Sequence, residues 1–171
     1  MTSSARYQDK KKVLFLCTHN SVRSQIAEGL LRAMHGDRYE AYSAGFGAAS
    51  VDPRAVLVMK ETGIDISGQR SKSIEEFQGT IFDLAVTVCD RAKQACPICS
   101  TQLELPTKSP KARVVIHRSF EDPALASGSE EEQLNVFRQV RDEMIDWISQ
   151  TFGISSIFTR PASWPGIPPH R

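Results

Sequence analysis

Four short apolar runs along the chain predict β-strands, because each is about five residues long and is bounded by polar or glycine-containing segments. They cover residues 12–16, 39–43, 84–88 and 113–117. The first run is apolar after Lys12, which is typical of a parallel strand buried on both faces. Two of these predicted strands end directly before a cysteine, Cys17 and Cys89.

Helices are predicted between the strands. Residues Ser24 to Met34 place apolar side chains at helical spacing, and a long final helix begins near Ser129 with apolar residues along one face. Asp52-Pro53 supplies an N-cap and a proline at the first helical position of a helix that stops at Gly63. The stretch Ser73-Ile74-Glu75-Glu76 has the spacing of a capping box and predicts a short helix.

Strands that alternate with helices indicate an α/β fold, in which a four-stranded parallel sheet carries helices on both faces. The strand connections are then right-handed crossovers. We expect this domain to cover residues 11–152, after a flexible N-terminal tail over residues 1–10. Residues 153–171 form a proline-rich C-terminal extension that is nevertheless rich in apolar residues. It is either loosely ordered or packed on its own domain or on a partner.

Composition and charge are those of a soluble globular protein: 171 residues, of which 40% are hydrophobic and 24% charged. The formal net charge of +1 gives no field that favours nucleic acid or an anionic membrane. The polar N-terminus does not look like a signal peptide, and no segment is apolar for long enough to span a bilayer. We therefore expect a cytoplasmic protein without nucleic-acid or membrane partners.

The loop Cys17-Thr18-His19-Asn20-Ser21-Val22-Arg23, called the anion loop below, leads from a predicted strand into a predicted helix. Backbone N–H groups converge at a helix N-terminus, where the helix dipole is also positive. Such a loop binds a tetrahedral dianion and favours the Cys17 thiolate, the nucleophilic form of cysteine. Arg23 adds a guanidinium fork that takes two oxygens at once.

Polar side chains complete the predicted anion site. Ser24 is placed to hydrogen-bond the thiolate or to cap the helix, while Asn20 and Ser21 are placed to hold the loop through bonds to the backbone. His19 either steers the oxyanion or faces solvent. Since a strand precedes the loop and a helix follows it, a nucleophilic Cys17 is favoured over a buried cysteine beside an incidental surface arginine. The predicted oxyanion-binding residues are Thr18, His19, Asn20, Ser21, Val22, Arg23 and Ser24.

The stretch from Cys17 to Gly29 resembles the opening of the low-molecular-weight tyrosine phosphatase superfamily, and within it the thioredoxin-coupled arsenate reductases. Tyr42-Ser43-Ala44-Gly45 and Gly63-Ile64-Asp65-Ile66-Ser67 are similar as well, as is the stretch around Cys89. The resemblance covers about residues 11 to 152. It implies a sheet of flavodoxin-like type and an enzyme that reduces arsenate to arsenite without a cofactor.

A covalent step through Cys17 needs a proton donor for the departing oxygen. Asp122 follows the fourth predicted strand, at the sheet edge where ligands bind in open α/β folds. The resemblance supports this choice, because Asp-Pro-Ala is the form found in arsenate reductases, whereas phosphatases tend to carry aromatic residues after Asp-Pro. Taken without the resemblance, Asp122-Pro123 is merely a turn, and Glu121 competes for the role.

The resemblance also implies a relay of thiols. In it Cys17 attacks arsenate, Cys89 attacks Cys17 and releases arsenite, and Cys96 captures Cys89 in a disulfide that thioredoxin reduces. Cys96 lies seven positions after Cys89, about two helical turns. A rigid helix would hold the two sulfurs ~10 Å apart, so pairing requires this segment to unwind.

Two features depart from the resemblance. Cys99 forms a CxxC with Cys96 and is an alternative resolving thiol, a bystander, or part of a zinc site with Cys89 and Cys96, although a fourth ligand is missing. Some members hold potassium with residues that match Asn20, Glu28 and Ser43 and with a further acid, where this chain has Lys72. We expect its ammonium to replace the cation and to pair with Glu28, which predicts no potassium dependence; the alternative is a solvated lysine.

Thioredoxin-linked arsenate reduction is the leading functional hypothesis. The alternative is a protein tyrosine phosphatase that hydrolyses phosphomonoesters through a phosphocysteine, although the small and polar residues near the anion loop do not suit a phenyl ring. A weak residual phosphatase activity is expected of such a reductase as well, because arsenate and phosphate share shape and charge. A non-enzymatic metal or redox sensor would leave Arg23 and Asp122 without a role. Mycothiol- or glutaredoxin-linked reduction would need fewer protein thiols.

Overall fold

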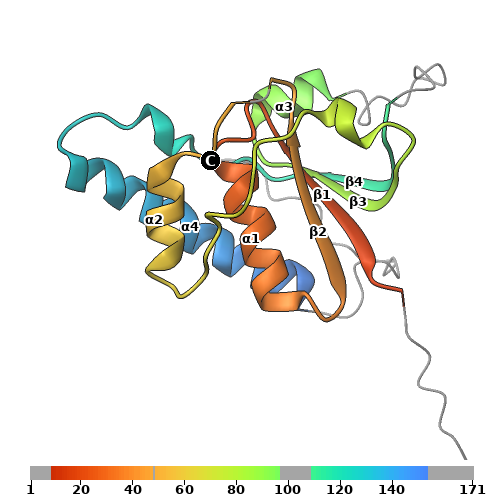
Figure 1. Ribbon diagram of the computed structural model, residues 1–171, viewed down its shortest axis with the longest axis horizontal. Coiled ribbons are helices and arrows are strands. Elements are labelled where there is room, and N and C mark those ends of the chain that lie inside the picture. Colours follow the sequence, from red (N-terminus) through yellow and green to blue (C-terminus); the bar gives the residue numbers. More distant parts are fainter. Residues whose placement is uncertain (1–8, 48, 97–108, 154–171) are drawn as a thin grey trace, which may run out of the picture.

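The computed structural model describes residues 9–47, 49–96 and 109–153. In this part of the chain four parallel strands form one sheet in the order β2-β1-β3-β4 (Figure 1). The strands are β1 (Lys11–Cys17), β2 (Tyr39–Gly45), β3 (Ile81–Thr87) and β4 (Lys111–His117). The predicted four-stranded parallel sheet is confirmed, and each strand overlaps its predicted run. The predictions for Cys99 and for nearly all of both tails lie outside the described residues.

Helices lie on both faces of the sheet, as predicted. Three of them, α1 (Arg23–His35), α2 (Pro53–Lys60) and α4 (Glu130–Phe152), lie together on one side of the strands in Figure 1. The short α3 (Asp90–Ala95) lies beside β1 and β3 towards the other side. Two 3-10 helices, η1 (Ile74–Phe77) and η2 (Pro123–Leu125), complete the described elements.

The helix ends follow from local side-chain chemistry. The Asp52 carboxylate caps α2 by accepting from the Arg54 N–H at 2.9 Å, and Ser129 forms a full capping box with Glu132 at the start of α4. The short helix predicted after Ser73 is confirmed as the 3-10 helix η1, but its capping box does not form. The Ser73 hydroxyl accepts from the Glu75 N–H, because the Glu76 N–H donates to the Ser73 carbonyl at 3.0 Å in the 3-10 pattern. The Glu76 carboxylate is held by Arg70 at 2.5 Å instead of reaching back to Ser73.

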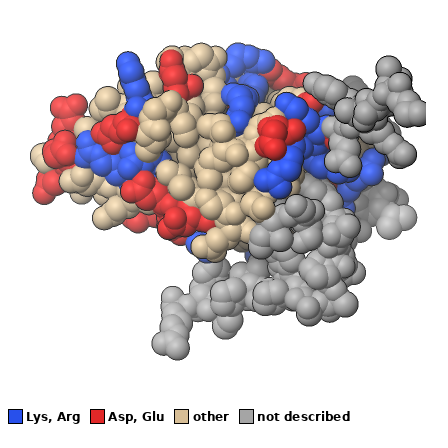
Figure 2. All heavy atoms as spheres, turned by 90° about the horizontal axis from the view of Figure 1, so that it is seen from below, with Lys and Arg blue, Asp and Glu red and all other residues tan. Residues whose placement is uncertain are grey.

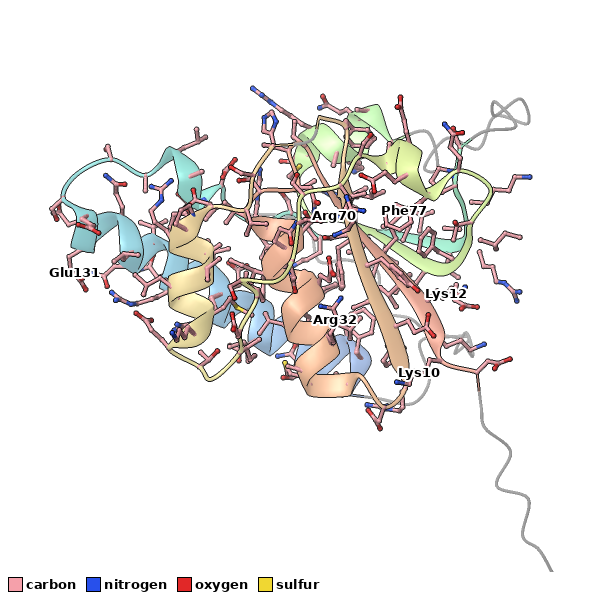
Figure 3. The ribbon with its side chains drawn as sticks, in the orientation of Figure 1. Lys10, Lys12, Arg32, Arg70, Phe77 and Glu131 are labelled. Atoms are coloured by element: carbon pink, nitrogen blue, oxygen red, sulfur yellow. The ribbon has the colours of Figure 1, made fainter. Side chains whose placement is uncertain are left out.

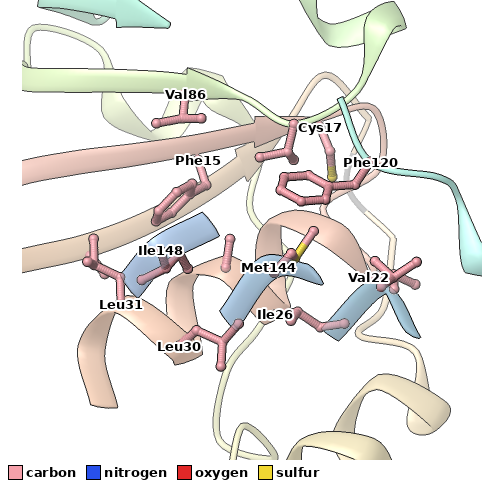
Figure 4. Close-up of a cluster of buried hydrophobic side chains, with 14 of the residues drawn as sticks. Phe15, Cys17, Val22, Ile26, Leu30, Leu31, Val86, Phe120, Met144 and Ile148 are labelled. Carbon is pink, nitrogen blue, oxygen red and sulfur yellow. The ribbon is translucent and has the colours of Figure 1, made fainter. Parts of the chain in front are cut away.

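Two hydrophobic clusters pack against the two faces of the sheet. Alternate residues of β1 point to opposite faces, so Phe15 belongs to the cluster with α1 and α4, while Leu16 belongs to the cluster with η1. Figure 4 shows the larger cluster, with Cys17 and Phe120 at one end of it. The anion loop therefore begins where the main core ends.

The charged surface is mixed. In the face seen in Figure 2, acidic and basic side chains lie near one another around an uncharged centre. Within the described residues, no helix combines the length and apolar character needed to cross a bilayer.

Candidate functional site

Backbone hydrogen bonds join three chain segments at the carboxyl edge of the sheet. The Val88 N–H donates to the Leu16 carbonyl at 2.9 Å, which ties the segment after β3 to the end of β1. The Phe120 N–H donates to the Val88 carbonyl at 3.1 Å, which ties the loop after β4 to the same place. The residues that follow β1, β3 and β4 are thereby fixed side by side, as the parallel topology predicts.

The anion loop is wrapped around the sulfur of Cys17. This thiol is free, only 3% exposed, and accepts a hydrogen bond from the Asn20 N–H at 3.2 Å. Asn20 has a φ of 51°, in the left-handed region that asparagine tolerates. The Ser24 hydroxyl lies 2.8 Å from the sulfur, so of its two predicted roles Ser24 takes the contact with Cys17. The cap position of α1 is Val22, which offers no side-chain cap.

The side chain of Asn20 holds the loop in shape, as predicted. Its Nδ2 donates to the hydroxyls of Ser24 at 2.8 Å and Ser43 at 2.9 Å, and its Oδ1 accepts from the Lys72 N–H at 2.7 Å. Ser21 also performs its predicted role, since its hydroxyl donates to the Ser50 carbonyl at 2.7 Å. Gln25 was not predicted: its Nε2 donates to the Asn20 carbonyl and to Asn20 Oδ1. Its position at the start of the predicted helix, two residues after Arg23, was the signal that the sequence offered.

Close backbone approach at the end of β2 fixes the outer side of the loop. A Cβ added to Gly45 would lie 2.8 Å from the Asn20 nitrogen and 2.9 Å from the Thr18 oxygen. The Phe46 and Gly47 N–H groups donate to that same Thr18 carbonyl at 2.9 and 3.1 Å. Only glycine fits at position 45 without displacing the loop.

A buried carboxylate lies behind the loop. The Ser43 hydroxyl donates to Glu28, whose carboxylate also pairs with Lys72 Nζ at 3.3 Å and with Arg32 at 2.5 Å. The predicted pairing of Lys72 with Glu28 is confirmed, and with its side chain 13% exposed Lys72 is not a solvated lysine. Beside this pair lies a cavity of about 540 Å³, lined among others by three residues labelled in Figure 3: Arg32, Arg70 and Phe77.

Tyr42 also lines this cavity. Burial, followed by its hydrogen bond to Glu40, raises the pKa of Tyr42 to about 12. The phenol therefore stays neutral at any physiological pH and contributes a donor rather than a charge.

Arg23 reaches across the site to Asp122. Its Nη2 donates to the Asp122 carboxylate at 2.8 Å, and its Nη1 donates to the Phe120 carbonyl at 3.3 Å. Asp122 and Cys17 line one cavity of about 240 Å³, whereas the exposed Glu121 does not line it. The geometry thus brings Arg23, Cys17 and Asp122 together in one cavity. Glu121 lines the neighbouring cavity instead, which contains Cys89 but not Cys17.

The walls of this cavity are short side chains. Besides Cys17, Arg23 and Asp122, it is lined by His19, Ser21, Val22, Ala49 and Ala124. His19 is exposed, and its side chain lies on the rim of the space rather than facing solvent alone. None of these lining residues is a phenylalanine, tyrosine or tryptophan.

Cys89 lies next to the anion loop as a second free thiol. Its sulfur is 3.5 Å from the Thr18 hydroxyl and accepts from the Ala92 N–H at 3.4 Å, so Cys89 caps the N-terminus of α3. Cys96 occupies the opposite end of that helix and is disulfide-bonded. Cys89 is buried in the larger cluster and Cys96 in the smaller one. The predicted separation of these two thiols by a helix is therefore confirmed.

Metal ligands do not gather in the described residues: within ranges 9–47, 49–96 and 109–153, no three His, Cys, Asp or Glu side chains lie close enough to hold an ion. The zinc alternative involving Cys99 falls outside those ranges.

The site combines a buried thiol at the end of a parallel strand, a polar loop folded around it and an arginine at the start of the next helix. These features define a class of protein with a cysteine-centred oxyanion site on an α/β sheet. The chain belongs to the low molecular weight phosphotyrosine protein phosphatase family, whose sequence profile matches residues 12–153.

Two similar relatives are both named arsenate reductase. The chain is 48% identical over 136 residues to an arsenate reductase of Halalkalibacterium halodurans, covering 80% of this chain and 91% of the relative. It is 42% identical over 136 residues to an arsenate reductase of Bacillus subtilis, with coverage of 80% and 91%.

Similar solved structures include both arsenate reductases and phosphatases. An arsenate reductase in the reduced state is 32% identical, with a TM-score of 0.59 over 82% of this chain and 95% of that one. A low molecular weight protein tyrosine phosphatase from T. tengcongensis is 29% identical, with a TM-score of 0.65 over 84% and 99%. The fold is thus shared by both activities, so the site must distinguish them.

Proposed function

We propose that this chain reduces arsenate to arsenite through the Cys17 thiolate. The observation that carries the proposal is the second free thiol, Cys89, whose sulfur lies beside Thr18 of the anion loop. A phosphatase needs only one thiol at this place, whereas the reduction of arsenate needs a second one to supply two electrons. The arsenate reductases among the relatives support the same activity.

In the first step arsenate binds in the anion loop, and its oxygens accept hydrogen bonds from the Arg23 guanidinium. The Cys17 thiolate attacks arsenic, a sulfur–arsenic bond forms, and one arsenate oxygen departs. Protonated Asp122 donates to that oxygen, which leaves as water. Asp122 is placed for this role because it lines the same cavity as Cys17. Its carboxylate lies 2.8 Å from Arg23 in the structure, so arsenate must first displace it from the guanidinium.

In the second step the Cys89 thiolate attacks the sulfur of Cys17. A sulfur–sulfur bond forms while the sulfur–arsenic bond breaks, and its electron pair leaves with arsenic as arsenite. The two thiolates are thereby oxidised by two electrons and arsenate is reduced by two. The Thr18 hydroxyl and the Ala92 N–H both lie next to the Cys89 sulfur and hold it beside the anion loop.

In the third step the Cys96 thiolate attacks the Cys89 sulfur, and Cys17 leaves as a thiolate. Cys96 must first be reduced, because it is disulfide-bonded in this structure. Helix α3 must also open, since Cys89 and Cys96 cap its two ends. A dithiol such as that of thioredoxin then reduces the Cys89–Cys96 disulfide and completes the cycle.

The second candidate is hydrolysis of phosphomonoesters, which the phosphatase relatives favour. It would use Cys17, Arg23 and Asp122 alone. The short walls of the 240 Å³ cavity, Val22, Ala49 and Ala124 among them, give a phenyl ring little surface to stack on. We therefore expect phosphatase activity to be a weak side reaction.

The test is arsenate-dependent NADPH oxidation in the presence of thioredoxin and thioredoxin reductase. Wild type is compared with Cys17→Ser, Cys89→Ser and Cys96→Ser, and each protein is also assayed with an aryl phosphate. We expect all three substitutions to abolish arsenate turnover, while only Cys17→Ser abolishes aryl phosphate hydrolysis. Retained turnover in Cys96→Ser alone would make Cys99 the resolving thiol. Absent arsenate turnover in wild type, with brisk hydrolysis, would make the protein a phosphatase.

A further inference from the structure

One histidine fastens the chain on both sides of Cys89. His117, the last residue of β4, places Nδ1 2.8 Å from the Thr87 hydroxyl and Nε2 3.0 Å from the Asp90 carboxylate. Thr87 ends β3 and Asp90 begins α3, so the short segment between them carries Cys89. Both contacts are satisfied by a neutral ring that carries its proton on Nε2, since the hydroxyl of Thr87 then donates to Nδ1.

These contacts are built into the edge of the sheet rather than lying loosely on the surface. Thr87 is fully buried and is the register partner of His117 in the pairing of β3 with β4. The His117 side chain is 16% exposed, whereas that of Asp90 is 73% exposed. The ring is therefore anchored at its Thr87 end, and the Asp90 end is the one that can release.

Helix α3 depends on such outside contacts. It has six residues, far fewer than an isolated helix needs to persist in water. Its N-terminus is held by the Cys89 sulfur at Ala92 and by the His117 ring at Asp90. When Cys89 attacks Cys17, its sulfur gives up the cap on α3, and the His117–Asp90 contact still holds the first turn of the helix.

We infer that His117 is a positioning residue for the thiol relay, which aims Cys89 at Cys17 through Thr87 and Asp90 and keeps α3 closed until Cys96 is needed. This inference rests on the proposed function. It assigns His117 opposite effects on two successive steps: the contact favours attack of Cys89 on Cys17, which needs a fixed sulfur, and opposes attack of Cys96 on Cys89, which needs an open helix.

The test uses the reduced full-length protein with His117→Ala, Asp90→Ala and the double variant. His117→Gln is the conservative variant, because its amide offers one donor and one acceptor as the neutral ring does. Gln94→Ala, an exposed position on the same helix, is the matched control. Single-turnover reactions with arsenate are quenched with an alkylating agent, and the two disulfides are quantified by mass spectrometry.

We expect formation of the Cys17–Cys89 disulfide to slow about fivefold in the two alanine variants, as loss of one hydrogen bond to a largely exposed carboxylate implies. Conversion to the Cys89–Cys96 disulfide is expected to accelerate, with His117→Gln and Gln94→Ala close to wild type. The double variant should resemble either single one, because both remove the same contact. Slowing of both steps together, or strictly additive effects, would overturn the inference.

A measurement without arsenate separates this inference from the proposed function. Amide hydrogen exchange in residues 90–95 of the reduced protein should be about fivefold faster in His117→Ala and Asp90→Ala than in wild type. Alkylation of Cys17 should be unchanged. Unaltered exchange overturns the inference even if arsenate is reduced. If exchange is faster in the two variants but the wild-type protein reduces no arsenate, the proposed function is overturned and, with it, the role of His117 in a relay.

Discussion

Replacing Ser24 with alanine tests whether the contact next to Cys17 activates the thiolate. A thiolate can only accept, so the Ser24 hydroxyl, 2.8 Å away, is placed to donate to it while accepting from Asn20 Nδ2. A hydrogen bond to a charged group contributes about 1.5 kcal/mol or more, which corresponds to about a tenfold change in the rate of a reaction that depends on it. Asn20 keeps its bond to Ser43, but its second Nδ2 proton loses its acceptor, so the thermal transition is measured beside the reactivity to detect any loss of stability.

The assay is the rate of Cys17 alkylation by iodoacetamide. It is measured in protein that carries Cys89→Ser, Cys96→Ser and Cys99→Ser, so that Cys17 is the one thiol left to react. We expect Ser24→Ala to react about tenfold more slowly than the parent protein, because the sulfur loses the hydroxyl that holds it in the anion loop. Ser149→Ala, which removes a hydroxyl that bonds only within α4, is the matched control. An unchanged rate in Ser24→Ala with an intact thermal transition would refute the reasoning.

Three further substitutions probe the frame of the site. Gly45→Ala places a Cβ 2.8 Å from a backbone nitrogen of the anion loop, so calorimetry should show lost arsenate binding, whereas Gly47→Ala, with its nearest neighbour at 4.0 Å, should bind normally. Burial raises the pKa of Asp52, but hydrogen bonds and charge from Arg54 outweigh it and lower that pKa below 3.8. The contribution of this carboxylate to the free energy of unfolding is complete above pH 3.8 and is lost as pH falls through the lowered pKa. Asp52→Asn should lower the free energy of unfolding by about 1 kcal/mol at pH 7 in denaturant titrations, and the variant should no longer show this loss in acid. Exchange of sodium for potassium should leave the arsenate turnover of wild type unchanged, while Lys72→Met should lower its thermal midpoint; stimulation of wild type by potassium would contradict this.

The fold was predictable because its signals are local. Apolar runs, the Asp52-Pro53 start of α2 and the Ser129 capping box each act within a few residues, and the structure confirms them. The capping box at Ser73 does not form, because the carboxylate of Glu76, the partner that the pattern requires, pairs with Arg70 six residues upstream. A capping-box pattern cannot reveal such competition, which depends on how the chain folds back.

The site was predictable in its residues but not in its connections. The parallel topology alone brings Cys17, Cys89 and Asp122 to one edge, so their proximity followed from the order of the strands. The contact between Arg23 and Asp122, by contrast, joins residues 99 positions apart. The bridge through His117 likewise depends on the register between β3 and β4, which no local pattern fixes.

The position of Cys96 bears on how the proposed relay would finish. Cys96 is 6% exposed in the smaller cluster, on the far side of β1 from the one that contains Cys89. To reach the Cys89 sulfur it must leave that cluster and α3 must open, which costs burial and helix hydrogen bonds together. The sulfur–sulfur bond then prevents the helix from closing, because its two ends are joined at ~2 Å rather than held ~10 Å apart. The oxidised segment would therefore remain exposed at the sheet edge, where an external dithiol can reach it, and reduction would restore the buried state.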